Sequence, residues 1–421
     1  MSAIIEQADR TADLPVFNED RMNLLIVTHT VGKNDGQGRV NYEVVQAALA
    51  AGHSVTLLST TVDETLSRHP RITVVRIAPS RVPTRLLKYQ AFALRAAAWI
   101  RAHRAEFDVV QVNGFIAWTR SDVSAIHFVH TGWFKSGYYP FRLSGGPYAA
   151  YQVLFTRLNS WCERWAFKRA GVLVPVSEKV AAELVDLGMP RDKIRVIHNG
   201  VDNVEFSPSP SQTSQRARFK LPEAPFMLLF AGDIRTGRKN LDTVLRAMVT
   251  CSPSVHLTVA AGTEKSPYPA MAAELGIADR VHFVGMIREM PALMRCADAF
   301  VFPSRYEAMS LVMLEALASG LPVITVHTSG GAEVITPECG VVLDDPDDER
   351  PLADAIMRLA SDPLRTRDMG HAAQALAATL SWQTMAARYL ALFEEIAANR
   401  KIGKKANHNA RAHRETVSVK T

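Results

Sequence analysis

The amino-acid sequence predicts an α/β protein built from two doubly wound domains that face each other across a cleft. Its 421 residues exceed what one hydrophobic core usually serves, so two domains of about 200 residues each are expected. Short, apolar, β-rich runs alternate with helical patterns from Asn23 onward, in two separate series. Because open parallel sheets bind ligands beyond the carboxyl ends of their strands, we expect the site between the two domains.

The predicted elements follow this division in chain order. Residues 1–22 are expected to form a loose leader. The first domain, residues 23–200, contains the strand candidates NLLIVTH, SVTLLS, ITVVRI, VVQVN, AIHFVH, GVLVPVS and IRVIHNG. Residues 201–225 are rich in proline and serine, which is typical of an interdomain linker. The second domain, residues 226–380, contains FMLLFAG, HLTVAAG, VHFVG, AFVFPS, PVITV and GVVL. Helices then fill the chain to residue 399, and residues 400–421 are expected to be a disordered tail.

Composition excludes several classes of protein. Four cysteines stand far apart without the spacing of a disulfide framework or a zinc site, which indicates a reducing cytoplasm. The N-terminus lacks the pattern of a signal peptide, and no apolar run reaches the roughly 18 residues that cross a bilayer. The net charge of +6 arises in the tail, where seven Lys or Arg accompany one acid, so we expect no nucleic-acid partner. The tail is interpreted as a solubilising end, with contact to anionic lipid as the alternative.

The stretch SRYEAMSLVMLEALASG, residues 304–320, predicts an anion-binding helix start. A strand ends just before it, Ser310 is placed to cap a helix that ends near Gly320, and Glu307 precedes the helix. The unpaired amides of the first turn then carry the positive end of the helix dipole, which suits a diphosphate. Glu315 shares a helix face with Leu311, where a carboxylate would accept hydrogen bonds from ribose hydroxyls. The alternative for Glu315 is an ordinary surface glutamate.

A second candidate phosphate loop is AGDIRTGRKNLDTVL, residues 231–245. It nearly spells the GxxxxGK[ST] pattern, but the hydroxyl residue that holds magnesium in that pattern is missing, which argues against an NTPase. Arg235, Arg238 and Lys239 beside a glycine turn still suit a diphosphate leaving group. The alternative is a set of solvated charges at the start of a helix.

Two features of the first domain point to the same cleft. Gly36 and Gly38 are expected to form a loop that closes over a substrate, although a simple tight turn explains them equally well. They do not complete the GxGxxG dinucleotide fingerprint, because Asn41 stands where its third glycine belongs. His130 is expected at the carboxyl end of the strand AIHFVH, where it could face the cleft or be a satisfied structural histidine.

Two other stretches of the first domain could touch a lipid. Residues 81–104 carry basic residues and no acid on a helical pattern that also shows Leu86, Leu87, Phe92 and Trp99, and residues 133–167 hold many aromatics interleaved with Lys and Arg. Both patterns suit peripheral contact with an anionic membrane or a lipid-linked acceptor. A helix that packs on the core and exposes one charged face is the alternative.

These stretches together resemble the retaining glycosyltransferases of family 4, which have the GT-B fold of two Rossmann-like domains. The likeness covers the chain from Asn23 to about Asn399. It is carried by GQGRVNYEVVQAALAAGHSV, FVHTGW, VIHNGVDNVEF and, most specifically, PSRYEAMSLVMLEALASGLPVI, which is similar to the family's PS-x2-E-x7-E motif.

The resemblance implies transfer of a sugar from a nucleotide diphosphate donor with retention of anomeric configuration. Its acceptor would be a glycan or a lipid-linked molecule of the cell surface, and the enzyme would be cytoplasmic or peripheral on the inner face of the membrane. No cofactor or metal is implied. The pair Asp345 and Asp347 matches a metal-binding DxD sequence, but its place after the last strand favours a turn and a helix cap.

The resemblance also implies roles for the residues of the cleft. Glu307 would contact donor-sugar hydroxyls, and Glu315 would contact the ribose. The diphosphate would be held by Lys239, by Arg235 or Arg238, and by the amides of Ser310, Leu311 and Val312. His130 and the loop of Gly36 and Gly38 would complete the cleft, and the terminal helix would cross back to the first domain.

Two departures from the family pattern leave questions open. Ala308, Met309 and Ser310 follow the first glutamate where many members have glycines, so we expect donor choice to depend on this spacer. Asp233 stands where many members have an arginine, so another arginine must act on the diphosphate. An epimerase of the same fold and a non-catalytic nucleotide-sugar-binding protein are the alternative functions.

Overall fold

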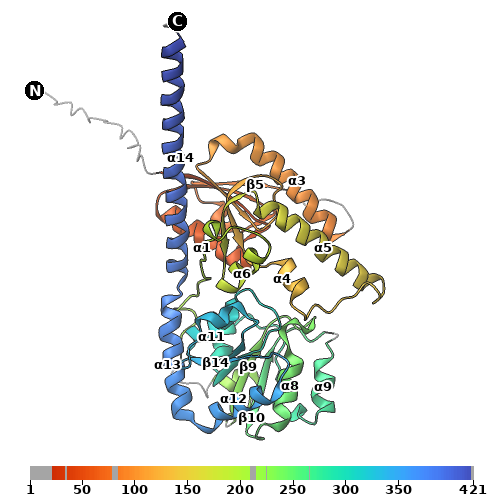
Figure 1. Cartoon of the computed structure of the whole chain (residues 1–421). Helices are drawn as coiled ribbons and strands as arrows, with labels where there is room; N and C mark the ends of the chain where they lie inside the picture. The colour runs from red at the N-terminus through yellow and green to blue at the C-terminus, as the bar shows by residue number, and fades with distance from the viewer. Residues whose placement is uncertain are drawn as a thin grey trace, which may run out of the picture.

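The computed structural model describes residues 21–33, 36–77, 84–208, 215–223, 225–264 and 266–418, with side chains placed as far as Ile402. The leader predicted at residues 1–22 therefore lies outside the described residues, apart from Arg21 and Met22. Two α/β domains are stacked one above the other, and a long C-terminal helix runs along one side of both (Figure 1).

The first domain is a six-stranded parallel sheet in the order β5-β3-β1-β6-β7-β8. Its central strands β1 and β6 are almost entirely buried, which explains why they read as largely apolar runs in the sequence, while the edge strand β5 is partly exposed. The strands are β1 (Asn23–Val27), β3 (Ser54–Ser59), β5 (Ile72–Arg76), β6 (Val109–Asn113), β7 (Ser121–Ile126) and β8 (Ala170–Pro175), and β2 (Thr30–Val31) pairs with β4 (Thr61–Val62). The helices are α1 (Gly36–Ala50), α2 (Glu64–Ser67), α3 (Arg85–His103), α4 (His130–Lys135), α5 (Pro147–Phe167) and α6 (Glu178–Asp186), with 3₁₀ turns η1 (Arg104–Glu106) and η2 (Arg191–Lys193).

The second domain repeats this architecture with the strand order β11-β10-β9-β12-β13-β14. Its strands are β9 (Phe226–Ala231), β10 (Val255–Ala260), β11 (Val281–Phe283), β12 (Ala299–Phe302), β13 (Val323–Val326) and β14 (Gly340–Leu343). Its helices are α8 (Leu241–Thr250), α9 (Tyr268–Glu274), α10 (Met290–Met294), α11 (Leu311–Ala318), α12 (Glu349–Ser361) and α13 (Pro363–Thr379), with 3₁₀ turns η3 (Ala217–Phe219), η4 (Gly237–Lys239), η5 (Ala278–Arg280) and η6 (Gly330–Val334). In both sheets the strand order reverses beside the first strand, and this switch point is where doubly wound sheets bind ligands.

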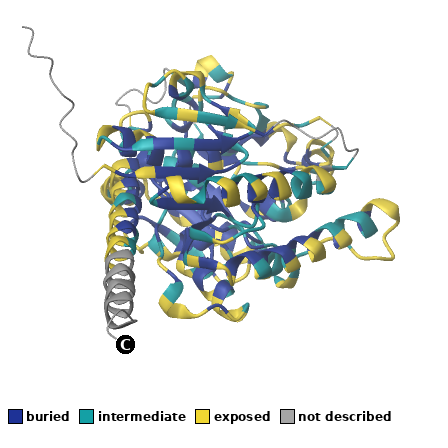
Figure 2. Ribbon diagram, turned by 90° about the horizontal axis from the view of Figure 1, so that it is seen from above, coloured by how far each residue is buried: buried dark blue, intermediate teal, exposed yellow. Residues whose placement is uncertain are grey.

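The two domains share part of their hydrophobic core. One cluster joins Val129, Val176 and Leu184 of the first domain to Phe300 and Met309 of the second. The remaining clusters lie between each sheet and its own helices, so the strands are buried while the outer faces of the helices are exposed (Figure 2). The two domains therefore meet along an apolar seam.

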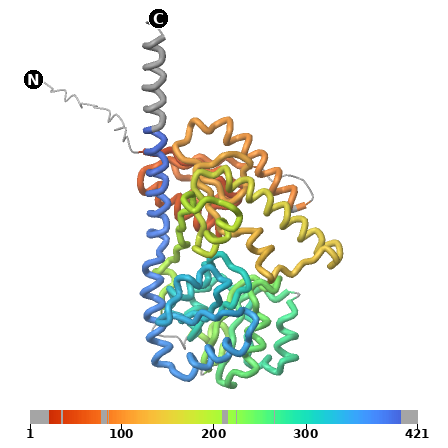
Figure 3. The backbone as a smooth tube through the Cα atoms, in the orientation of Figure 1, coloured from red at the N-terminus to blue at the C-terminus, as the bar shows by residue number. Residues whose placement is uncertain are grey.

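The C-terminal helix α14 (Trp382–Ser418) confirms the predicted return to the first domain. Tyr389 and Phe393 belong to the same core cluster as Val40 and Val44 of α1, and the tube in Figure 3 shows α13 and α14 along one side of both domains. Two segments of the chain connect the domains, one near Val201 and one near Ser381. They lie side by side, because Val201 pairs with Ser381. Gly200 is required there, because a Cβ atom would lie 2.6 Å from the backbone of Trp382.

Three predicted boundaries were wrong. The strand expected at AIHFVH ends at Ile126, so His130 begins a helix instead of ending a strand. The stretch IRVIHNG forms no strand and runs beside β8 with a single bridge from Ile194 to Leu173. Helix α14 does not end at residue 399 but continues to Ser418, where we had expected disorder, because the composition of the tail is polar but not unfavourable to a helix.

Candidate active site

A cavity of about 530 Å³ lies between the domains where the loops of both switch points meet. Its walls come from the loops that follow β1, β6, β7, β9 and β12 and from the starts of α1 and α11. Both domains therefore contribute to it. Its lining includes His130, Asn113, Gly36, Arg238, Lys239, Glu307, Met309, Ser310 and Leu311.

Glu307 forms the charged centre of this cavity. Its carboxylate accepts a short hydrogen bond from Lys239 Nζ, and Arg238 Nη1 lies 3.4 Å from the same oxygen. The Glu307 side chain is 13% exposed. Burial alone would raise the pKa of Glu307, but the positive charges of Lys239 and Arg238 outweigh it and hold that pKa below its usual value. Glu307 is therefore ionised at neutral pH.

Two helix starts converge on the same space. Helix α11 begins after Ser310, and its first helical bond runs from Leu314 N to Ser310 O, so the preceding amides have no acceptor within the helix. The first residue of α1, Gly36, lies so close that a Cβ atom there would be 3.7 Å from Leu311 Cδ1. Two positive dipole ends thus meet beside Arg238 and Lys239, which makes a strong site for an anion such as a diphosphate.

His130 approaches the cavity from the first domain. Its Nδ1 lies 2.6 Å from Glu163 Oε1, and the backbone N–H of His130 donates to the same carboxylate. Glu163 lies on α5 and is fully buried. This bond fixes the imidazole ring and directs Nδ1 away from the ligand, so Nε2 is the ring nitrogen that remains for the cavity.

Glu315 lines an adjoining cavity of about 310 Å³ that shares Gly36 and Leu311 with the central one. Burial raises its pKa to about 7, with a smaller contribution from the negative charge of Glu205, while Arg39 opposes the shift. A half-ionised carboxyl group at this place can accept hydrogen bonds from the vicinal hydroxyls of a ribose.

Comparison with known families decides the class of the protein. A model described as Glycosyltransferase Family 4 matches residues 34–204, and one described as Glycosyl transferases group 1 matches residues 211–376. This chain belongs to glycosyltransferase family 4. The prediction of a glycosyltransferase is therefore confirmed.

Relatives and solved structures agree with this assignment. The enzyme is 29% identical to a D-inositol 3-phosphate glycosyltransferase of Xylanimonas cellulosilytica, over 75% of this chain and 78% of the relative. It is 28% identical to the protein of that name from Mycobacterium bovis, over 89% of this chain and 83% of the relative. Sucrose-phosphate synthase from Thermosynechococcus elongatus superposes with a TM-score of 0.74 at 21% identity, covering 90% of this chain and all of that one. HepE from Anabaena, in complex with UDP and glucose, superposes with a TM-score of 0.67 at 18% identity, covering 89% and 100%. These superpositions establish the GT-B fold.

The structure places the two arginines proposed for the diphosphate in different surroundings. Arg235 of the glycosyltransferase forms a bidentate pair with Asp233 and is 83% exposed, so it lies outside the cavity and its predicted role is not supported. Arg238 lines the cavity, donates to Tyr306 O and lies against Glu307. Asp233, which stands where many family members have an arginine, thus pairs with Arg235 outside the cavity.

The expectation of a closing loop at Gly36 and Gly38 was wrong. Both residues lie in the first turn of α1, and Gly38 is buried, with its carbonyl accepting from Gly32 N–H.

Ser310 occupies the N-cap position as predicted, but its hydroxyl makes no capping hydrogen bond. Asp345 accepts from Asp347 N–H in a turn, while the cap of α12 is Asp348. Among the residues that the structure describes, no cluster of His, Cys, Asp or Glu could hold a metal ion.

The sequence analysis assigned no role in the site to three polar side chains that line the cavity. Asn113 Oδ1, His127 Nε2 and Asn199 Oδ1 are buried, and the described part of the chain offers them no hydrogen-bond partner. Burial lowers the pKa of His127 to about 4, so its ring is neutral at pH 7. Unpartnered buried polar atoms are costly, and a sugar with several hydroxyls is a ligand that would satisfy them. Asn113 ends β6 and His127 follows directly after β7, so their places beside strand ends were an available signal, whereas Asn199 lies in a stretch that forms no strand.

Proposed function

We propose that this enzyme transfers a sugar from a nucleoside diphosphate sugar to an acceptor hydroxyl with retention of configuration at the anomeric carbon. The observation that carries the proposal is the convergence of two helix starts and two cations on one cavity that also contains Glu307. Such a site binds an anion and stabilises the negative charge that grows on a departing diphosphate.

Each residue then has a defined task. Lys239, Arg238 and the amides of Ser310, Leu311 and Val312 hold the diphosphate, and Glu307 accepts hydrogen bonds from hydroxyls of the donor sugar. Glu315 binds the ribose. His130, with its Nδ1 engaged by Glu163, presents Nε2 to the sugar from the opposite wall.

The reaction in this proposal needs no protein nucleophile. The bond between the anomeric carbon and the diphosphate oxygen breaks, the acceptor oxygen bonds to that carbon from the same face, and the acceptor proton passes to the departing phosphate oxygen. The cations and helix dipoles supply the charge stabilisation that a metal ion provides in metal-dependent enzymes with a phosphate leaving group, so we propose that transfer is independent of added metal.

A lipid-linked acceptor is supported by the surface formed by α3, α5 and the loop before α5. It carries seven of the thirteen large apolar side chains that are exposed in the described residues: Leu87, Leu94, Leu143, Tyr148, Leu154, Leu158 and Trp161. The same two helices carry the basic residues Lys88, Arg95 and Arg101 of α3 and Arg157 and Arg164 of α5, while the acid of α5, Glu163, is buried. Exposed apolar side chains on helices rich in basic residues suit peripheral contact with an anionic bilayer. In this proposal the enzyme works on the cytoplasmic side of the membrane in the synthesis of a cell-surface glycan. Among the described residues, no helix has the length and apolar content to span a bilayer.

A panel of nucleoside diphosphate sugars tests the proposal, because a ligand that binds only the folded state raises the melting temperature. The donor found in this way is then incubated with the wild type and with Glu307→Gln, and released nucleoside diphosphate is measured with and without acceptor. We expect Glu307→Gln to lower transfer by about 100-fold or more, since the amide cannot match the ionised carboxylate in the transition state.

Three outcomes separate the proposal from its alternatives. Isomerised donor without released nucleoside diphosphate would indicate an epimerase of the same fold. Donor binding with neither transfer nor slow hydrolysis would indicate a binding protein. Equal transfer by the wild type and Glu307→Gln would exclude the site described above.

A further inference from the structure

The loop that carries Glu307 is held by the opposite domain. Residues 303–310 join β12 to α11 in the second domain, yet Ser177 Oγ donates to Ala308 O at 2.9 Å, and Asn199 Nδ2 donates to Met309 O at 3.3 Å. Both donors belong to the first domain. The backbone that positions the donor-binding carboxylate therefore depends on contact between the domains.

Tyr306, next to Glu307, makes the deepest of these contacts. It is 1% exposed, and its hydroxyl lies 3.0 Å from Val129 O and 2.9 Å from Glu183 Oε2 in the first domain. Its ring packs edge-on against Phe128, and Lys179 Nζ lies 3.9 Å from the ring centre. A side chain of the second domain is thus enclosed by the loop before α4 and by α6.

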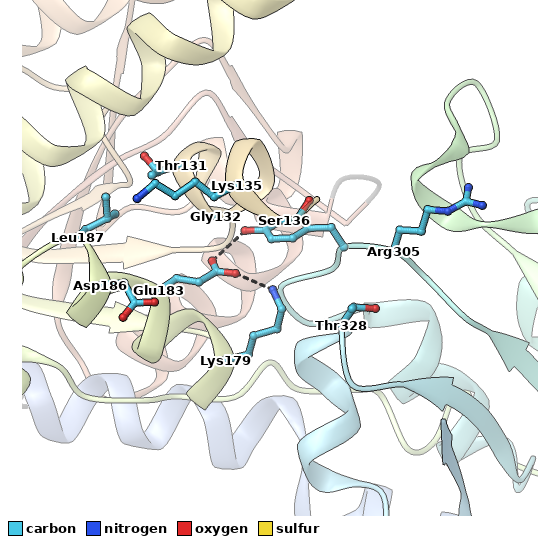
Figure 4. Close-up of a pocket in the computed structure, with 11 residues that line it drawn as sticks. Thr131, Gly132, Lys135, Ser136, Lys179, Glu183, Asp186, Leu187, Arg305 and Thr328 are labelled. Carbon is cyan, nitrogen blue, oxygen red and sulfur yellow. Dashed lines mark hydrogen bonds and ion pairs between the residues drawn. The ribbon is translucent and has the colours of Figure 1, made fainter. Parts of the chain in front are cut away.

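Glu183 joins this contact to the helix that begins with His130. Its carboxylate accepts from Lys179 Nζ at 2.7 Å, and these two residues face each other in the cavity of Figure 4. The same carboxylate lies against Gly132 of α4 so closely that a Cβ atom there would collide with it. Figure 4 also shows Gly132 and Lys135 of α4 on the wall above Glu183.

The connection runs between neighbours of two site residues. Tyr306 directly precedes Glu307, and Val129 directly precedes His130, so one phenol hydroxyl links the two walls of the cavity. We propose that Tyr306 is a positioning residue, which sets the placement of Glu307 relative to His130 by its hydrogen bonds to Val129 and Glu183 when the domains are closed. This inference rests on the proposed function for its effect on turnover, but the interdomain contact itself does not depend on it.

The Tyr306→Phe variant removes the hydroxyl and keeps the buried ring. Because the donor is held mainly by Lys239, Arg238 and the start of α11, we expect its dissociation constant to stay within about twofold of the wild type. Turnover should fall roughly ten- to hundredfold, since small displacements of reacting groups have effects of this size. A purely structural role would not separate kcat from donor affinity in this way.

Two further variants make the test specific. Glu183→Ala removes one acceptor of the same hydroxyl, so the double variant Tyr306→Phe/Glu183→Ala should lose no more turnover than the larger of the two single losses. Tyr389→Phe is the matched control, since this tyrosine is also 1% exposed and its hydroxyl has no hydrogen-bond partner in the described part of the chain. Its turnover should equal that of the wild type. Turnover of Tyr306→Phe within twofold of the wild type, or a proportional loss of donor affinity, would overturn the proposal.

A distance measurement tests the contact without activity. The four native cysteines are buried, so spin labels can be placed on introduced cysteines at the exposed positions Arg68 and Glu274, one in each domain. We expect Tyr306→Phe to broaden the distance distribution or shift it toward longer values, and Tyr389→Phe to leave it unchanged. Identical distributions in Tyr306→Phe and the wild type would overturn the proposal. If no donor is turned over by the wild type, the proposed function fails, and this measurement still decides the role of Tyr306.

Discussion

Glu307 remains an ionised carboxylate inside the cleft because Lys239 and Arg238 lie against it. The side chains of Lys239 and Glu307 are only slightly exposed. Removing one of them would leave the other charge poorly compensated, which typically costs about 3–5 kcal/mol of folding stability for a buried ion pair. In the proposed function, a donor diphosphate would add negative charge beside Lys239, and the dipoles of α1 and α11 would offset it. The negative charge of Glu307 is therefore balanced by the positive charges of Lys239 and Arg238.

Glu315 should make donor binding depend on pH. Its pKa is raised to about 7 in the folded protein from an ordinary value of 4.5, so the folded state binds more protons than the unfolded state between these values. Stability contributed by this group is present below about pH 4.5 and is lost as pH rises to 7. Ribose hydroxyls favour the ionised carboxylate, so donor affinity should increase between pH 6 and 8. Calorimetric titration measures this, and Glu315→Gln should flatten the profile. An unchanged profile in Glu315→Gln would exclude Glu315 as the titrating group.

The spacer between Glu307 and α11 illustrates what sequence can predict at the level of an element. The start and end of α11 followed from Ser310 and Gly320, and the positive φ of Gly320 agrees with a helix C-terminus. The contacts of Tyr306, Ala308 and Met309 with the first domain could not be predicted, because they depend on how the domains pack. The sequence also could not predict that Arg238 lines the cavity while Arg235 does not, since both arginines lie close to Gly237.

Met309 should restrict the donors that the enzyme accepts. It is 5% exposed, lines the central cavity and stands where many family members have glycine. Met309→Ala should lower stability by about 2–4 kcal/mol and widen the set of nucleotide sugars that raise the melting temperature. Met313→Ala is the matched control, because Met313 is buried on α11 but is not among the residues that line the cavity. Met313→Ala should lower stability without changing the set of nucleotide sugars that raise the melting temperature. An unchanged donor range in Met309→Ala would exclude this role.

At the scale of the whole molecule, the two-domain architecture was predictable because parallel strands buried on both faces leave a clear apolar signal. The return of α14 followed only from the family resemblance, and its extension to Ser418 was missed. The exposed surface of α3 and α5 was foreseen as basic and aromatic, but its orientation away from the core needed the structure. Helix α3 also reaches the cleft between the domains, since Tyr89 lines the central cavity.

Trp161, which is 62% exposed on α5, tests the role of this surface. Trp161→Glu should weaken cosedimentation with vesicles containing anionic lipid by about tenfold, because it replaces an interfacial aromatic with a charge that the bilayer repels. Val249→Glu changes an exposed apolar residue of the second domain and should bind vesicles like the wild type. Loss of binding in both variants to the same extent, or in neither, would contradict a specific contact through α5.

The anomeric configuration of the product tests the central claim most directly. Nuclear magnetic resonance of a reaction with the identified donor should show a product with the anomeric configuration of the donor, formed together with one nucleoside diphosphate per transfer. Lys239→Ala, which removes the cation nearest Glu307, should reduce this product by about 100-fold or more. A product of inverted configuration, or wild-type rates in Lys239→Ala, would contradict the account.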